Sequence, residues 1–159
     1  MKFSKSTSAR VLLCVLLAWG VFGVDQYIKH FILRGATHTF FGGQLTIGLF
    51  YNQGIAFSIN LPDLLLGLAI VVSLVFVLWL AFSQLRHHQV WAAAAAGLVL
   101  GGSTGNAYDR IQHGAVVDYI HVFYTSVFNI ADMAIAVGLL TIVILLFQRK
   151  DRVEIDIKN

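Results

Sequence analysis

Four apolar stretches divide this chain and leave little room for a water-soluble fold. They run over residues 11–24, 64–82, 90–102 and 128–147. A chain of 159 residues that is 58% hydrophobic and only 12% charged holds more apolar surface than a soluble core of this size can bury. The sequence therefore predicts an integral membrane protein, folded as one domain over residues 1–159.

The lengths of these stretches decide how far each helix must extend. A hydrocarbon core of about 30 Å needs about 20 helical residues. The first and third stretches are shorter, so we expect their helices to continue, through Asp25 toward Lys29 and through Asn106 toward Asp109. Four spans are predicted, at about residues 10–28, 63–83, 90–109 and 128–148.

The basic residues indicate which side of the membrane each end faces. Cytoplasmic flanks of membrane proteins hold an excess of lysine and arginine. Most of the 11 lysine and arginine residues lie at the two termini or in the turn between the second and third spans. We therefore expect both termini and this turn in the cytoplasm, and the two longer connections on the outer side.

The two outer connections carry strand patterns. Residues 31–62 place β-branched and aromatic residues around a pair of glycines, which is typical of a hairpin or small sheet. In residues 110–127 the sequence AVVDYIHVF alternates, which predicts a strand that could lie beside the first connection. The segment YNQGIAFSI, residues 51–59, could grip an extended peptide through Asn52 and Gly54, lie on the membrane as an amphipathic flap, or form a tight turn.

Two aspartates, Asp118 and Asp132, lie in almost wholly apolar surroundings with no lysine or arginine within several residues. Desolvation raises the pKa of a carboxyl group, and two carboxyls brought together share one proton. Such a pair can activate a water molecule with its ionised member while its protonated member donates to a peptide carbonyl. Asn129, three residues before Asp132, could orient that carboxyl. The alternative is that Asp132 caps its helix and Asp118 is a surface residue.

The remaining charged residues have local explanations. Asp25 and Lys29 have the spacing of an ion pair on one helix face, which predicts a structural role. Asp109 is followed at once by Arg110, with Asn106 one turn earlier, so we expect Asp109 to be ionised and structural beside its own cation. Arg110 and Asn106 could then reach carbonyl or phosphate oxygens of a ligand.

Two other functions fit parts of the sequence. GGSTG, residues 101–105, matches the G-x-S-x-G nucleophile motif and would make the chain an intramembrane serine protease with Ser103 as nucleophile and His113 or His121 as base. That motif needs a preceding strand, whereas a helical span precedes it here, and glycines in membrane helices usually allow close helix contact. A small proton-coupled transporter would keep its essential carboxylate near the bilayer midplane. The histidines lack the spacing of a metal site, and we expect no metal.

Five motifs, in this order among the predicted spans, carry a resemblance to a known family. They are DQYIK (25–29), NQGIAFS (52–58), GGSTGNAYDR (101–110), GAVVDYI (114–120) and FNIAD (128–132). Together they cover most of the chain outside the apolar spans, and they resemble bacterial lipoprotein signal peptidase, also called signal peptidase II. The resemblance implies an all-α membrane protein of four transmembrane helices with a small periplasmic β-cradle and a flap-like periplasmic segment.

The resemblance also implies an activity: an aspartyl endopeptidase of the bacterial inner membrane that removes the signal peptide from diacylglyceryl-modified prolipoproteins, N-terminal to the lipidated cysteine. By motif position Asp118 and Asp132 correspond to its catalytic dyad. The expected substrate-binding residues are Asn52, Asn106 and Arg110, to which the residue patterns add Gly54 and Asn129. The expected structural residues are Asp25, Lys29 and Asp109.

The expected partners are the lipid-modified prolipoprotein and membrane lipids. No cofactor and no nucleic acid is expected, and the protein is expected to be a monomer. The active site would face the periplasm, with both termini in the cytoplasm.

Overall fold

The fold is given by a computed structural model, which describes residues 5–54, 90–123 and 126–158 together with residues 65, 68, 71, 72, 75 and 79. Most of the second predicted span, 63–83, lies outside the described residues, as does the part of the predicted flap after Gly54.

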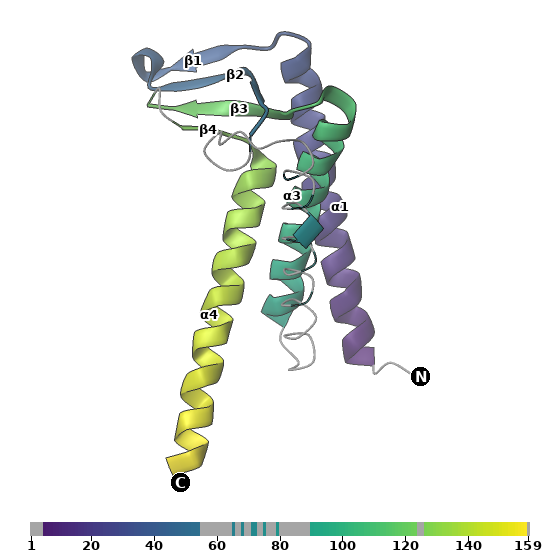
Figure 1. The fold of residues 1–159 in the computed structure, drawn as a ribbon, viewed down its shortest axis with the longest axis vertical. Coiled ribbons are helices and arrows are strands. Elements are labelled where there is room, and N and C mark those ends of the chain that lie inside the picture. The colour runs from purple at the N-terminus through teal and green to yellow at the C-terminus, as the bar shows by residue number, and fades with distance from the viewer. Residues whose placement is uncertain are drawn as a thin grey trace.

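Three long helices form the body of the part of the chain that the structure describes: α1 (Lys5–Leu33), α3 (Val90–His113) and α4 (Ile130–Lys158). Helix α3 packs against both of the others, while α1 and α4 touch each other much less. A sheet lies across one end of the helices, and both chain termini lie at the opposite end (Figure 1). The side of the membrane that each end faces stays a prediction.

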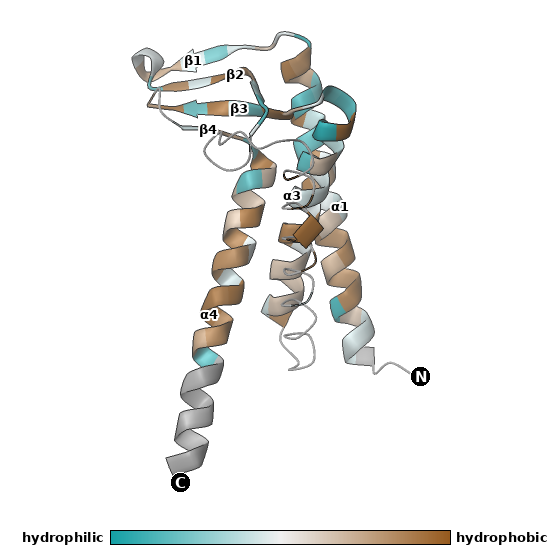
Figure 2. Ribbon diagram, in the orientation of Figure 1, coloured by the Kyte–Doolittle hydropathy of each residue, from teal (hydrophilic) through white to brown (hydrophobic). Residues whose placement is uncertain are grey.

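Two of the described helices are long and apolar enough to cross a membrane. They comprise Ser6–Leu33, with a mean hydropathy of 1.9, and Ile130–Gln148, with a mean hydropathy of 2.6. Few of their side chains are buried inside the protein, and the apolar residues lie along their middle parts (Figure 2). Helix α3 is built largely from buried alanine and glycine and packs between them. The count of four spans stays a prediction.

Glycines set the close approach of α3 to its two neighbours. A Cβ atom on Gly101 would fall 2.5 Å from the carbonyl oxygen of Ala18 on α1, and one on Gly102 would fall 2.4 Å from the carbonyl oxygen of Ala131 on α4. Real Cβ atoms do not approach backbone oxygens so closely. The interpretation of GGSTG as a helix-contact sequence is therefore confirmed.

The sheet has four antiparallel strands in the order β1-β2-β3-β4. They comprise β1 (His38–Phe40), β2 (Leu45–Asn52), β3 (Val116–Val122) and β4 (Ser126–Phe128). Gly42 and Gly43 have φ values of 65° and 97° in the turn between β1 and β2, which glycine adopts without strain. The predicted small sheet is confirmed, and β2 pairs with β3 so that Phe50 lies opposite Asp118 and Asn52 opposite Val116.

Candidate active site

The start of helix α4 is fixed by a reciprocal cap. Asn129 precedes the helix, and its Oδ1 accepts a hydrogen bond of 2.8 Å from the backbone N–H of Asp132. The Asp132 Oδ2 accepts in return from the Asn129 N–H at 3.3 Å. Such a capping box satisfies two backbone donors at once. It also holds the Asp132 carboxyl at the N-terminal end of helix α4, next to the sheet.

Two further donors of the first turn of α4 are bound by other elements. The Ile130 N–H donates to the Tyr119 hydroxyl on β3 at 3.1 Å, and the Ala131 N–H donates to Asp25 Oδ1 on α1 at 3.2 Å. Unpaired N–H groups at a buried helix end are costly. These bonds therefore fix the end of α4, and with it Asp132, against both α1 and β3.

Asp118 on β3 is completely buried and accepts two side-chain amide hydrogen bonds. Asn129 Nδ2 donates to its Oδ1 at 2.7 Å, and Asn52 Nδ2, from the end of β2, donates to its Oδ2 at 3.1 Å. Burial raises the pKa of the Asp118 carboxyl to about 6, and the negative charge of Asp132 adds to this increase, whereas the amide bonds oppose it. Asp118 is thus poised to change its protonation near neutral pH.

Asn106 on α3 connects the second aspartate to the same network. Its Nδ2 donates to Asp132 Oδ1 at 2.7 Å, while its Oδ1 accepts from Asn129 Nδ2 at 3.1 Å. Asn129 therefore contacts Asp118, Asp132 and Asn106. The structure brings the two aspartates into one hydrogen-bond network that draws on α3, α4, β2 and β3.

A buried ion cluster lies beside this network. The predicted pair of Lys29 and Asp25 is present at 2.5 Å, and Lys29 Nζ also lies 2.6 Å from Asp109 Oδ2. All three side chains are 1% exposed or less. We define Asp25, Lys29 and Asp109 as the ion cluster.

The expectation that Arg110 is the cation of Asp109 is wrong. Asp109 Oδ2 contacts Lys29 and accepts from the Val117 N–H at 3.1 Å, and its Oδ1 accepts from Gln26 Nε2 at 2.9 Å. Consecutive residues of a helix do not face each other, so the Arg110 side chain leaves in another direction. Sequence adjacency was a poor guide to the partner of this carboxylate.

Arg110 instead joins α3 to the end of β2. Its Nη2 donates to the Gly54 carbonyl at 3.0 Å, and its Nη1 donates to the Asn106 carbonyl at 3.4 Å. Gly54 in turn donates its N–H to Asn52 Oδ1 at 3.0 Å. The five expected substrate-binding residues therefore lie in, or directly beside, the network around the two aspartates.

Two residues of the site were missed by sequence reasoning: Tyr119 and Gln26. The Tyr119 hydroxyl donates to Asp25 Oδ1 at 3.4 Å, and burial raises the pKa of this phenol, which keeps its proton as a donor. Gln26 donates to Asp109 as described above. Gln26 directly follows Asp25 in DQYIK, and Tyr119 directly follows Asp118, so their only sequence signal was a place inside the motifs.

The residues of the serine alternative do not meet in the described part of the chain. Ser103 lies inside α3, without the preceding strand that a nucleophile elbow requires. His121 Nε2 lies 3.1 Å from the Gly48 carbonyl oxygen, and the His113 ring lies beside the Tyr51 ring, 6.5 Å between centroids. Among the described residues, no group of three or more histidine, cysteine, aspartate or glutamate side chains is arranged to hold a metal ion.

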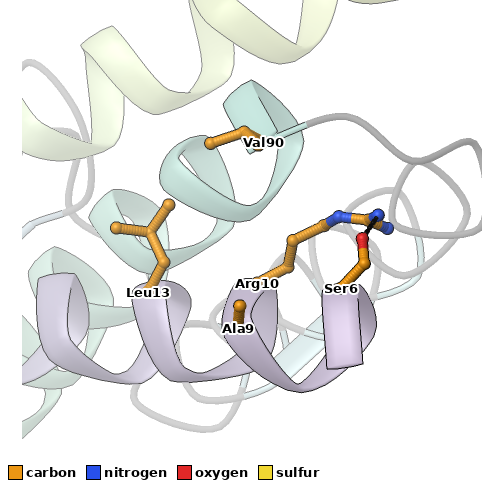
Figure 3. Close-up of a pocket in the computed structure, with 5 residues that line it drawn as sticks. All are labelled: Ser6, Ala9, Arg10, Leu13 and Val90. Atoms are coloured by element: carbon orange, nitrogen blue, oxygen red, sulfur yellow. Dashed lines mark hydrogen bonds between the residues drawn. The ribbon is translucent and has the colours of Figure 1, made fainter. Parts of the chain in front are cut away.

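A shallow recess lies far from this network. It is lined by Ser6, Ala9, Arg10, Leu13 and Val90, where α1 and α3 have their ends away from the sheet (Figure 3). The Arg10 guanidinium donates to the Ser6 hydroxyl there. The recess contains neither aspartate, so the candidate site rests on the hydrogen-bond network and not on this hollow.

Two solved structures share the fold, and both are described as bacterial membrane enzymes. The first has a TM-score of 0.74 and 24% identity, and the match covers 87% of this chain and 90% of the other. The second has a TM-score of 0.68 and 25% identity, covering 84% and 91%. This chain therefore shares its fold with both of these proteins.

Sequence comparison gives the family. A family model described as signal peptidase II matches residues 17–148. The lipoprotein signal peptidase of Pseudoalteromonas atlantica is 35% identical over 154 residues, covering 86% of this chain and 90% of the relative. That of Pseudomonas putida is 44% identical over 114 residues, covering 64% of this chain but only 65% of the relative. This chain belongs to the signal peptidase II family of membrane proteases.

Proposed function

We propose that this protein cleaves the signal peptide from diacylglyceryl-modified prolipoproteins, N-terminal to the lipidated cysteine, with Asp118 and Asp132 as an aspartyl dyad. Membership of the signal peptidase II family supports a prolipoprotein as the substrate. The dyad is supported by one observation above all: Asn106 and Asn129 join both carboxyl groups in a single hydrogen-bond network. The charge of Asp132 also raises the pKa of Asp118, and two carboxyl groups that interact in this way are suited to general acid and base catalysis.

The proposed reaction needs no covalent intermediate. The ionised aspartate takes a proton from water as the water attacks the scissile carbonyl, and the protonated aspartate donates to the carbonyl oxygen. The resulting gem-diol then collapses: the C–N bond breaks as the aspartate that took the water proton donates it to the leaving nitrogen, and the other aspartate takes back a proton from one hydroxyl. The raised pKa of Asp118 lets this carboxyl group take up or release a proton near neutral pH, which the proposed reaction requires.

Arg110 and Gly54 are proposed to hold the peptide beside the dyad. The Arg110 Nε is buried and has no acceptor in the described part of the chain, although its two Nη atoms are bound. A peptide carbonyl entering from the β2 side could take this donor. Asn52, which contacts Asp118, lies two residues from Gly54 and would contact the same stretch of peptide.

The proposed membrane arrangement has four spans, both termini in the cytoplasm and the dyad at the periplasmic face of the inner membrane. The network lies at the sheet end of the helices, and the termini lie at the other end (Figure 1). Acyl chains on the substrate cysteine would remain in lipid while the signal helix packs alongside. Binding energy from these remote parts would hold the scissile bond at the dyad.

The expected requirement for a diacylated substrate provides the test of this function. Purified protein in detergent is incubated with a diacylated precursor and with the same precursor lacking the lipid, and kcat/KM is measured for both. We expect cleavage of the diacylated precursor and a value about 100-fold or more lower for the unmodified one, because the remote binding energy is lost. Cleavage of neither precursor, or equal rates for both, would contradict the proposal. Cleavage in detergent also excludes transport as the whole explanation.

A further inference from the structure

We propose that Lys29 is a positioning residue for the dyad: its ammonium group holds the Asn106 amide in the orientation that donates to Asp132. This inference rests on the proposed function. The spacing of Asp25 and Lys29 suggests only a structural ion pair, and nothing in that pattern connects Lys29 with the reacting groups.

The contacts of Lys29 go beyond charge compensation. An ammonium group has three donors, and here three oxygens surround it: Asp25 Oδ2 at 2.5 Å, Asp109 Oδ2 at 2.6 Å and Asn106 Oδ1 at 3.3 Å. The two carboxylates already outnumber the single cation. The contact with the neutral amide of Asn106 is therefore not required to neutralise Lys29. It connects Lys29 with the dyad, because Asn106 donates to Asp132.

The orientation of the Asn106 amide follows from what surrounds it. Its oxygen faces two donors, Lys29 Nζ and Asn129 Nδ2, and its nitrogen faces the acceptor Asp132 Oδ1 at 2.7 Å. In the flipped amide, the NH₂ group would face those two donors and the oxygen would face a carboxylate. Lysine can only donate, so it disfavours the flipped form in a way that a residue with both donor and acceptor would not.

The orientation of the Asn106 amide affects both Asp118 and Asp132. Asn129 donates through the same Nδ2 to Asn106 Oδ1 and to Asp118 Oδ1. An Asn106 amide that is free to flip would remove a donor from Asp132 and an acceptor from Asn129. Lys29 forms no hydrogen bond or ion pair with Asp118 or Asp132 in the described part of the chain, yet it thereby fixes the geometry of both.

The positive charge of Lys29 also acts on the dyad. The charged groups that face Asp118 are Asp132 from α4, Lys29 from α1 and Arg110 from α3. Loss of the lysine charge disfavours the ionised form of the dyad. Both limbs of the pH profile of kcat/KM should then move to higher pH.

The experiment compares two variants that differ only at Lys29: Asp109→Asn, and Asp109→Asn combined with Lys29→Met. The double variant keeps the net charge of the ion cluster, so it is a better folding candidate than Lys29→Met alone, which is measured beside it. Folded protein is quantified by size-exclusion chromatography and thermal unfolding. On the diacylated precursor we then measure kcat, normalised to the amount of folded enzyme, together with KM and the pH profile of kcat/KM.

Loss of Lys29 should lower kcat about 10- to 100-fold relative to Asp109→Asn, with KM within about threefold and the pH profile moved upward. A purely structural lysine would change only the amount or stability of folded protein. Equal kcat and pH profiles in the two variants overturn the inference, and so does failure of both lysine variants to fold. Wild-type protein and Asp132→Asn run in parallel: an inactive wild type, or an active Asp132→Asn, would instead refute the proposed function.

Discussion

Replacing Asp118 with asparagine is expected to abolish cleavage of a diacylated precursor, and replacing Asp132 with asparagine should do the same. Each rate should fall by about 10⁴-fold or more, as for other catalytic residues that act as a unit. Asparagine has nearly the shape of aspartate, but it can neither accept a proton from water nor hold the shared proton. The measurement is product formation by the purified variants, followed by mass spectrometry of the released signal peptide.

Ser103→Ala is the matched control for these variants. It lies on α3, and its hydroxyl is the nucleophile of the serine alternative. The aspartyl mechanism predicts activity within about threefold of wild type, whereas a serine mechanism predicts complete loss. Substantial turnover by either aspartate variant, in membranes or in detergent, would contradict the dyad mechanism.

The second large effect is expected from Gly102→Ala. The added Cβ would lie 2.4 Å from the carbonyl oxygen of Ala131, and backbone cannot move aside as a flexible side chain can. Helices α3 and α4 must then separate. Overpacking of this kind costs about 1–3 kcal/mol or more. Ala131 directly precedes Asp132, so activity per folded molecule should fall together with the unfolding temperature.

Gly20→Ala is the control for this helix contact. Gly20 lies on α1, and a Cβ atom there would meet no described residue within 4 Å. The same substitution should leave activity unchanged, and the unfolding temperature should stay equal or rise slightly, because alanine is a better helix former. Equal unfolding temperatures for Gly102→Ala and Gly20→Ala would show that the close approach of α3 and α4 does not stabilise this fold.

The sequence predicted the parts of the fold that depend on local pattern. Alternation in AVVDYIHVF predicted β3, the glycine pair at 42 and 43 predicted the turn before β2, and the spacing of Asp25 and Lys29 predicted their ion pair. Each of these signals comes from residues close together in the chain. Periodicity and turn chemistry are sufficient for that kind of prediction.

Contacts between distant segments were much harder to predict. Asp109 pairs with Lys29 and not with the adjacent Arg110, because α1 brings Lys29 to it across the helix interface. The apolar surroundings of Asp118 and Asp132 favoured a pairing of the two carboxyl groups. Only the fold shows that Asn129 contacts both and that Asn106 links Asp132 to Lys29.

The most direct test of the dyad is a titration of the Asp118 carboxyl by ¹³C NMR in detergent micelles, with the resonance assigned through Asp118→Asn. We expect Asp118 to titrate near pH 6 because it is desolvated and faces Asp132. In Asp132→Asn the neighbouring negative charge is gone, so the pKa of Asp118 should fall. An Asp118 pKa that is the same with and without the Asp132 charge would show that the two carboxyls do not interact, which contradicts a shared dyad.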